Sequence, residues 1–174
     1  MLHLITLLLL ACAVFANPLP DTGETHLDTR QETYGRLRTY LTDGQNRTGA
    51  LVVSKVTSIP LVNGDWVVTL PTVNRVYSSW SISEGYTGQA EIAVSGGKRF
   101  CLDAGSYPGN GVRLKVWECL DVPQQQWHFA NGRLELVGYG LCADLRDGAL
   151  GTARGYVQTW QCYDGNINQK WRLY

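Results

Sequence analysis

The feature that most restricts how this chain can fold is an internal repeat of about forty residues. Three short blocks occur twice and in the same order: Cys-x-Asp, then Trp-x-Cys, then Gln-x-Trp. The matched segments are 101–104 with 142–145, 116–119 with 159–162, and 125–127 with 169–171. Corresponding positions lie 41, 43 and 44 residues apart, as insertions in turns would produce. Such self-similarity indicates a fold built from repeated modules.

A third, eroded copy is expected upstream of these two. Its register is set by Trp80, which lies 15 residues after Asp65, close to the spacings of 14 and 16 in the other copies. Ile82 and Glu91 stand where the other copies have their second cysteine and final tryptophan. The alignment matches Trp80 with Trp117 and Trp160, and Gln89 with Gln125 and Gln169. The three copies then cover about residues 46–97, 98–136 and 137–174.

Each copy contains short runs that favour β-strands, separated by turn signals. Strand-forming runs cover residues 112–116, 134–137 and 156–160, and pairs such as Asn110-Gly111 mark turns between them. No copy alone buries much apolar surface, so the copies are expected to close around a shared core. The hydrophobic fraction of 44% and the charged fraction of 17% suit a packed core and exclude a disordered chain.

Charge and histidine content exclude several classes of partner. Lys+Arg 15 and Asp+Glu 15 cancel, so no basic surplus points to a nucleic acid. The chain has no Cys-x-x-Cys, and only His26 and His128 lie outside the N-terminal apolar segment, so no metal is expected. Neither a Gly-x-Ser-x-Gly elbow nor a dinucleotide-binding glycine loop is present, and no cofactor is predicted.

The N-terminal segment has the pattern of a signal peptide. Residues 4–10 are an apolar run followed by small residues, and cleavage after Ala16 is predicted. Residues 1–16 would then be removed and the protein secreted to the extracellular space. The run is too short for a transmembrane segment, which needs roughly 20 apolar residues. The segment from Leu9 to Cys12 also resembles a bacterial lipoprotein cleavage site, so a lipid-anchored form is the alternative.

Export places the remaining cysteines in an oxidising compartment, where disulfides form. Removal of the signal peptide also removes Cys12 and leaves an even number of cysteines. Four cysteines allow three pairings. The pairs Cys101–Cys119 and Cys142–Cys162 are favoured because their separations, 18 and 20 residues, match each other inside the two copies.

Residues 17–45 are expected to form a separate leader before the repeats. Thr29 and Glu32 have the spacing of a capping box, and apolar side chains between residues 34 and 41 follow at helical spacing until Asp43. A short amphipathic helix is therefore predicted, as a linker lying on the main domain or as a propeptide or protein-docking element. The only N-glycosylation sequon starts at Asn46, which is expected in an exposed, glycosylated loop.

The three blocks in threefold repetition resemble the ricin B-chain lectin family, also called the family thirteen carbohydrate-binding modules. The resemblance covers residues 46–174. It implies an all-β fold, a β-trefoil with pseudo-threefold symmetry in which barrel strands are capped by hairpins. It also implies one candidate sugar pocket per repeat, with Trp127 and Trp171 in the core.

The pocket of this family uses an aspartate after the first cysteine, a glutamine before the strand aromatic, that aromatic, and an Asn-Gln pair before the final tryptophan. The third repeat matches all five positions, with Asp144, Gln158, Trp160, Asn168 and Gln169. The second repeat is a weaker candidate site, with Asp103, Lys115, Trp117, Gln124 and Gln125. In the first repeat Ser78 and Gly88 stand at the amide positions, so Asp65 and Trp80 are not expected to bind sugar.

These residue types suit a sugar on chemical grounds. A galactose-like ring offers vicinal hydroxyls and one apolar C–H face, to which a carboxylate, amides and a flat indole are complementary. Asp144 is expected to accept hydrogen bonds from two hydroxyls, and Trp160 to stack on the ring face. Gln158 and Asn168 would select the hydroxyl epimer, and Gln169 would orient Asp144 from behind.

We therefore expect a secreted lectin that binds galactose-type or arabinose/xylose-containing glycans without turnover. Glycosidases use two facing carboxylates, whereas each predicted pocket supplies one aspartate. Binding through more than one pocket would strengthen attachment. Two alternatives stay open: a β-trefoil protease inhibitor, and a glycan-targeting accessory subunit of a separate enzyme or toxin that docks through the leader helix.

Overall fold

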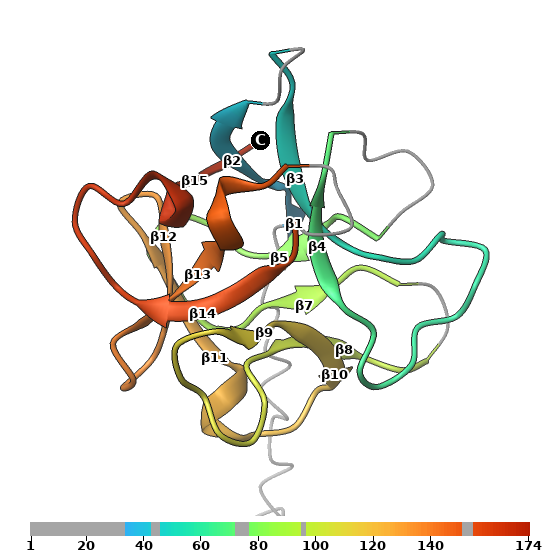
Figure 1. The fold of residues 1–174 in the computed structure, drawn as a ribbon. Coiled ribbons are helices and arrows are strands. Elements are labelled where there is room, and N and C mark those ends of the chain that lie inside the picture. The colour runs from blue at the N-terminus through green and yellow to red at the C-terminus, as the bar shows by residue number, and fades with distance from the viewer. Residues whose placement is uncertain (1–33, 43–45, 72–76, 95–96, 151–154) are drawn as a thin grey trace, which may run out of the picture. The chain divides into compact units, whose positions relative to one another are not determined.

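The computed structural model describes residues 34–42, 46–71, 77–94, 97–150 and 155–174 (Figure 1). The chain divides into two units, Met1–Arg30 and Gln31–Tyr174, and all described residues lie in the second. The predicted signal peptide and the leader up to residue 33 lie outside the described residues. Within the described ranges, no helix has the length and apolar character needed to cross a membrane.

The described part of the chain consists of short strands and 3-10 turns, without an α-helix. The strands are β1 (Tyr34–Gly35), β2 (Leu37–Thr42), β3 (Thr48–Val53), β4 (Val67–Leu70), β5 (Trp80–Ser81), β6 (Tyr86–Gln89), β7 (Glu91–Ile92), β8 (Phe100–Asp103), β9 (Val112–Arg113), β10 (Lys115–Glu118), β11 (Gln126–Ala130), β12 (Arg133–Leu136), β13 (Leu141–Leu145), β14 (Val157–Gln161) and β15 (Trp171–Leu173). The 3-10 turns are η1 (Pro123–Gln125), η2 (Arg146–Gly148) and η3 (Ile167–Gln169). The strands form three sheets, in the orders β1-β5-β7-β8-β10, β6-β11-β12-β13-β14-β9 and β15-β2-β3-β4.

One pairing pattern recurs three times along the chain. Each repeat has a first strand, a two-stranded hairpin and a return strand, and the hairpins are β3–β4, β8–β10 and β13–β14. Each first strand pairs with the leading strand of its hairpin (β2–β3, β7–β8, β12–β13) and with a return strand (β2–β15, β7–β5, β12–β11). The hairpins meet through backbone bonds from Val67 N to Leu114 O and from Leu114 N to Val157 O, at 3.0 and 2.8 Å. This arrangement confirms the predicted β-trefoil.

The barrel is closed by a strand where the sequence predicts a helix. β2 pairs with the C-terminal β15, with Thr39 opposite Trp171, so the two ends of the domain lie side by side (Figure 1). The helix prediction is therefore wrong for residues 34–42, and the repeat domain starts before residue 46. Leu37 and Thr39 are buried and Tyr40 is exposed, a period-two alternation that suits a strand with one face on the core.

Three buried tryptophans occupy equivalent places in the core and correct the predicted register. Trp80, Trp127 and Trp171 are each 0% exposed, which confirms the core positions predicted for the latter two. Each indole N–H donates to a carbonyl of the leading hairpin strand: Trp80 to Leu51 (3.0 Å), Trp127 to Leu102 (3.0 Å) and Trp171 to Ala143 (2.9 Å). Trp80 is thus the third Gln-x-Trp-type tryptophan, and its alignment with Trp117 and Trp160 is wrong.

Two further assignments in the first repeat change with this register. The Asp65 carboxylate accepts from Lys55 Nζ at 2.7 Å and from Val62 N at 2.8 Å, so it holds a turn and does not correspond to the pocket aspartates. Gln89 lies in β6, before the second hairpin, and its amide donates to Gln125 Oε1 at 3.1 Å. The expected repeat boundaries fall one strand late, because the first strand of each repeat carries none of the motif residues.

Both favoured disulfides are present. Cys101–Cys119 and Cys142–Cys162 each join the leading strand of a hairpin to the residue that follows its second strand. The closed loops span 18 and 20 residues, for which the chain-entropy model gives about 3 kcal/mol of stabilisation each. In the first repeat Ala50, opposite Leu70, takes the place of the leading cysteine.

Candidate functional site

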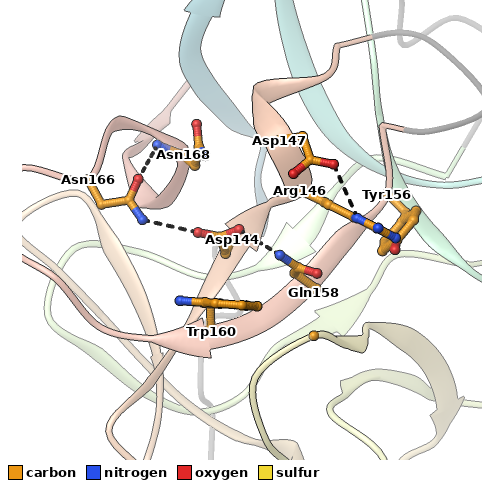
Figure 2. A pocket seen from close by; sticks show the side chains of 9 residues that line it. Asp144, Arg146, Asp147, Tyr156, Gln158, Trp160, Asn166 and Asn168 are labelled. Atoms are coloured by element: carbon orange, nitrogen blue, oxygen red, sulfur yellow. Dashed lines mark hydrogen bonds and ion pairs between the residues drawn. The ribbon is translucent and has the colours of Figure 1, made fainter.

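A cavity of about 450 Å³ lies on the third repeat (Figure 2). It is lined by Gly111, Asp144, Arg146, Asp147, Tyr156, Gln158, Trp160, Asn166 and Asn168. Four of the five residues predicted for this pocket are among them. The fifth, Gln169, is fully buried and bonded to Asp144. The β13–β14 hairpin explains why they converge, since Asp144 pairs with Gln158 and Cys142 with Trp160, which places alternate residues on one face.

Asp144 lies at the centre of the cavity and is held by three side-chain amides. Its Oδ1 accepts from Gln158 Nε2 at 3.0 Å, and its Oδ2 accepts from Asn166 Nδ2 at 3.2 Å (Figure 2). Its Oδ2 also accepts from Gln169 Nε2 at 3.2 Å. The residue is only 4% exposed. A carboxylate offers about four lone-pair positions, so about one remains for a ligand. Acceptance from two sugar hydroxyls, as predicted, therefore requires Gln158 or Asn166 to release Asp144.

Gln169 connects the carboxylate to the backbone beside the disulfide. Its Nε2 also donates to the carbonyl of Gln161 at 2.9 Å, and its Oε1 accepts from Tyr163 N at 3.0 Å. All of its amide hydrogen-bonding groups therefore point toward protein and not toward the cavity. This geometry is what the predicted positioning role requires.

Trp160 forms an exposed wall whose rim comes from the second repeat. Its side chain is 38% exposed, although it belongs to a strand. The loop before β9 lies against it, with Gly111 N donating to Thr159 O at 2.9 Å and Gln161 N donating to Asn110 Oδ1 at 2.6 Å. Gly111 has a φ of +83°, which favours glycine, and a Cβ there would lie 4.0 Å from the Trp160 ring. Two repeats thus build one pocket.

Asn166 is the main site residue that sequence reasoning missed. It caps η3, because its side chain accepts from Asn168 N at 3.0 Å, while its amide donates to Asp144. Asn168 lines the cavity from the same turn. The preference for asparagine at helix N-caps, after the turn residue Gly165, was the signal available in the sequence.

Three further residues border the cavity without having been predicted. Arg146 stacks on Tyr156, with its Cζ 4.9 Å from the ring centroid, and its Nε lies 3.3 Å from Asp147 Oδ2 (Figure 2). Tyr156 directly precedes β14 and forms an isolated bridge with Val68 of the first repeat. No short motif links Tyr156 to Arg146, so only the fold reveals that these two are neighbours.

The second repeat carries a smaller cavity of about 200 Å³. It is lined by Asp103, Ser106, Lys115, Trp117, Leu120 and Gln124, with the predicted Gln125 buried and bonded to Asp103. Asp103 accepts from Gly105 N at 2.7 Å and from Gln125 Nε2 at 3.0 Å. Lys115 Nζ lies 4.7 Å from the centroid of the Trp117 ring, so the ammonium covers the surface on which a sugar would stack.

The first repeat has apolar side chains at the same positions. Hairpin pairing gives the correspondences Val52 to Asp144, Val68 to Gln158 and Leu70 to Trp160. Ala50, Val52 and Val68 are buried and pack with Leu70 and Tyr156 in a small cluster of their own. The polar groups that bind a hydroxyl are therefore missing from this hairpin.

Fold and site together define a β-trefoil with a polar, indole-walled pocket on its third hairpin. Residues 72–171, more than half of the chain, match the family model of the ricin-type beta-trefoil lectin domain. The chain belongs to this family of carbohydrate-binding domains. No curated protein sequence matches it.

Two solved structures of low sequence identity share the fold, and a third is similar at a lower score. The designed threefold-symmetric protein ThreeFoil is similar at a TM-score of 0.58 and 20% identity, over 80% of this chain and 96% of that one. The protein of the PSL1a-E64 complex is similar at a TM-score of 0.54 and 14% identity, over 82% of this chain, and the chain spans 46% of its length. The C-half of the earthworm R-type lectin, solved in complex with GalNAc, gives a TM-score of 0.49 and 15% identity, over 80% and 96% of the two chains.

Proposed function

We propose that this protein is a secreted lectin whose third-repeat cavity holds one galactose-type sugar unit. The observation that carries the proposal is the Asp144 carboxylate, fixed by three amides and placed beside the exposed indole of Trp160. An anionic acceptor next to a flat apolar surface matches a sugar ring, which presents hydroxyl donors on its edge and C–H groups on one face. Arabinose- or xylose-containing glycans are the second class of ligand.

Each residue of the cavity has a different role in the proposed recognition of the sugar. Trp160 stacks on the C–H face, and Asp144 accepts from a hydroxyl through its remaining lone pair. Gln158 and Asn168 provide amide groups at the side of the cavity, where each can donate and accept. An epimer with one hydroxyl misplaced would leave such a group unpaired, which is the basis for selecting one sugar.

Binding without turnover is also part of the proposal. The structure adds a second carboxylate to the cavity, Asp147, where the sequence predicts one aspartate per pocket. Asp147 is 80% exposed and pairs with Arg146, and Asp144 accepts from three amides. Neither carboxyl has the apolar surroundings that keep the general acid of a glycosidase protonated.

Export is supported by the two disulfides, which form in oxidising compartments. Asn46 is exposed between β2 and β3, which fits the glycosylation predicted for it. The second-repeat cavity would serve as a weaker site, so that one chain engages a branched or repeating glycan at two points.

Trp160→Ala is the sharpest test of the proposed site. We expect a loss of sugar affinity of about tenfold or more, because the variant no longer buries the apolar face of the sugar against an indole. Full burial of one apolar side chain contributes about 1.5–3 kcal/mol. Stability should change little, since the side chain is exposed. The measurements are calorimetric titration with methyl galactoside, arabinoside, xyloside and glucoside, and thermal unfolding. Tyr107→Ala, at a 91% exposed aromatic outside the cavity, is the matched control.

Asp144→Ala should lose sugar binding as well, but its result is harder to interpret because the change also affects stability. It leaves three amides without their acceptor, of which Gln158 and Gln169 are buried, at a cost of about 1–3 kcal/mol for each buried donor. We therefore expect Asp144→Ala to lower stability as well as sugar affinity. Unchanged sugar affinity in Trp160→Ala would refute the site, and a wild-type chain that binds no glycan on an array would refute the function.

A further inference from the structure

At the meeting point of the three hairpins, each repeat contributes one residue at an equivalent position. Trp66 lies opposite Lys115, Arg113 opposite Gln158, and Tyr156 opposite Val68. Cross-strand partners project from the same face of a sheet, so all three lie on the face that carries the cavities. Arg113 Cζ is 4.4 Å from the centroid of the Trp66 ring and 4.8 Å from that of Tyr156. One arginine therefore contacts aromatic rings from both neighbouring repeats.

Within the part of the chain that the structure describes, the guanidinium of Arg113 is held by aromatic rings and not by hydrogen-bond acceptors. The residue is half-buried, and its Nε is buried without a hydrogen-bond partner. Among the described residues, none of the ion pairs includes it. Burial lowers the pKa of Arg113 from its usual value, because loss of water disfavours the charged form. An arginine nevertheless stays charged at neutral pH, so the group is a cation in need of an anion.

Contacts connect this cation to the third-repeat cavity. Tyr156, which touches Arg113, lines the cavity and is also stacked by Arg146 (Figure 2). On the other side, Arg113 is the cross-strand neighbour of Gln158, whose amide holds Asp144. One residue therefore separates Arg113 from the proposed sugar pocket, Tyr156 on one side and Gln158 on the other, so Arg113 borders the pocket.

We propose that Arg113 forms a second subsite, which binds a carboxylate or sulfate carried by the sugar unit next to the one in the Asp144 cavity. The inference rests on the proposed function. A guanidinium is planar and presents paired N–H donors, the arrangement that recognises both anions. The acids already facing this region are Asp144, held by amides, and Asp147, paired with Arg146. Since Asp144 would repel a charge on the sugar it holds, the anionic group belongs to the neighbouring unit.

The test compares three disaccharide probes with the full chain. They share a galactose unit and carry, as second unit, galactose, galacturonic acid or a sulfated galactose. We expect the acidic probes to bind about tenfold more tightly than the neutral one at low salt, because hydrogen bonds to charged groups are the strong ones. The advantage should shrink as salt is raised. The uronate and sulfate probes show which anion fits the subsite.

Arg113→Met keeps the length of the side chain between the rings and removes the charge. In this variant the ratio of acidic to neutral affinity should fall to about one. Arg172→Met is the matched control, since it removes a cation stacked on Tyr40 outside the cavity and should keep the wild-type ratio. If Arg113→Met fails to fold, Arg113→Gln also removes the charge and should likewise bring the ratio of acidic to neutral affinity to about one.

The outcomes separate the two proposals. Equal wild-type affinity for neutral and acidic probes would overturn the subsite while leaving the Asp144 cavity as the sugar site. A tenfold preference that persists in Arg113→Met would also overturn it, because another cation would then be responsible. If no probe binds the wild type, the proposed function fails and this inference fails with it.

Discussion

The third and first repeats differ at the hairpin surface while sharing one core geometry. In the core, Trp171 and Trp80 are both fully buried, and each indole donates to the leading hairpin strand, at 2.9 and 3.0 Å. On the surface, the third repeat carries Asp144 with its amides, whereas Val52 at the corresponding place belongs to an apolar cluster. The residues that build the core and those that line the cavity are therefore different residues of the same module.

The second repeat is intermediate, since it keeps some of the polar residues of the third repeat that the first repeat lacks. Asp103 and its buried partner Gln125 are kept, with a bond of 3.0 Å. Lys115, however, replaces the amide of Gln158 and lies over the Trp117 ring. A second difference is Val122 at the N-cap of η1, where η3 has Asn166, the third amide that holds Asp144.

The strongest test of the shared core is Trp80→Ala beside Trp171→Ala. Each removes a fully buried indole, so each should lower the free energy of unfolding by about 3–5 kcal/mol. Urea denaturation of both variants is the measurement. A loss below about 1 kcal/mol for Trp80→Ala alone would show that the first repeat does not use its tryptophan as the others do.

Val52→Asp tests whether the surface position can be converted on its own. Val52 is 0% exposed. In the corrected register Val68 takes the place of Gln158, and Ser78, two residues before Trp80, takes the place of Gln169 and not that of Gln158. The new carboxylate would be buried and unpaired, and we expect a loss of about 3 kcal/mol or more with no added sugar binding.

Adding Val68→Gln and Ser78→Gln supplies donors and should recover part of the stability lost in Val52→Asp. Val52→Ala is the control for lost packing. The comparison of the repeats fails if Val52→Asp alone unfolds at the same urea concentration as the wild type.

Lys115→Gln should have the smallest effect on stability, and it tests the comparison between the second and the third repeat. It removes a cation–π contact worth about 0.5–1 kcal/mol and places an amide beside Asp103, as Gln158 stands beside Asp144. We expect the weak second site to strengthen, so that a calorimetric titration shows two sugars per chain. A stoichiometry that stays at one, with the fold intact, would mean that Lys115 is not what limits this pocket.

Much of the site could be predicted because its chemistry lies in short, repeated blocks. Asp144 follows Cys142 by two residues, so one strand fixes both, and the Gln-x-Trp block places Gln169 next to a core tryptophan. Asn166 was missed because it belongs to a turn outside those blocks. Arg113 and Tyr156 could not be predicted together, since they come from different repeats and meet only through strand pairing.

The register of the first repeat was wrong for a related reason. Without cysteines or a Gln-x-Trp block, Trp80 could be aligned with either of two tryptophans in each of the other repeats. Only the hydrogen bond to Leu51 decides between them. The helix predicted over residues 34–41 was wrong for a similar reason. The position of Leu37 among its apolar neighbours suits both the helical period and the strand period of two. The partner strand β15, which decides for a strand, lies at the far end of the sequence.

The sequence by itself determined the repeated module, both disulfides, the core tryptophans of two repeats and the grouping of Gln158, Asn168 and Gln169 with Asp144, because each of these follows from residue types at short spacing. The tertiary structure decided how the ring of modules closes, which tryptophan of the first repeat enters the core, and which residues of different repeats touch. Those outcomes depend on pairing between strands far apart in the chain, and spacing along one strand carries no information about its partner.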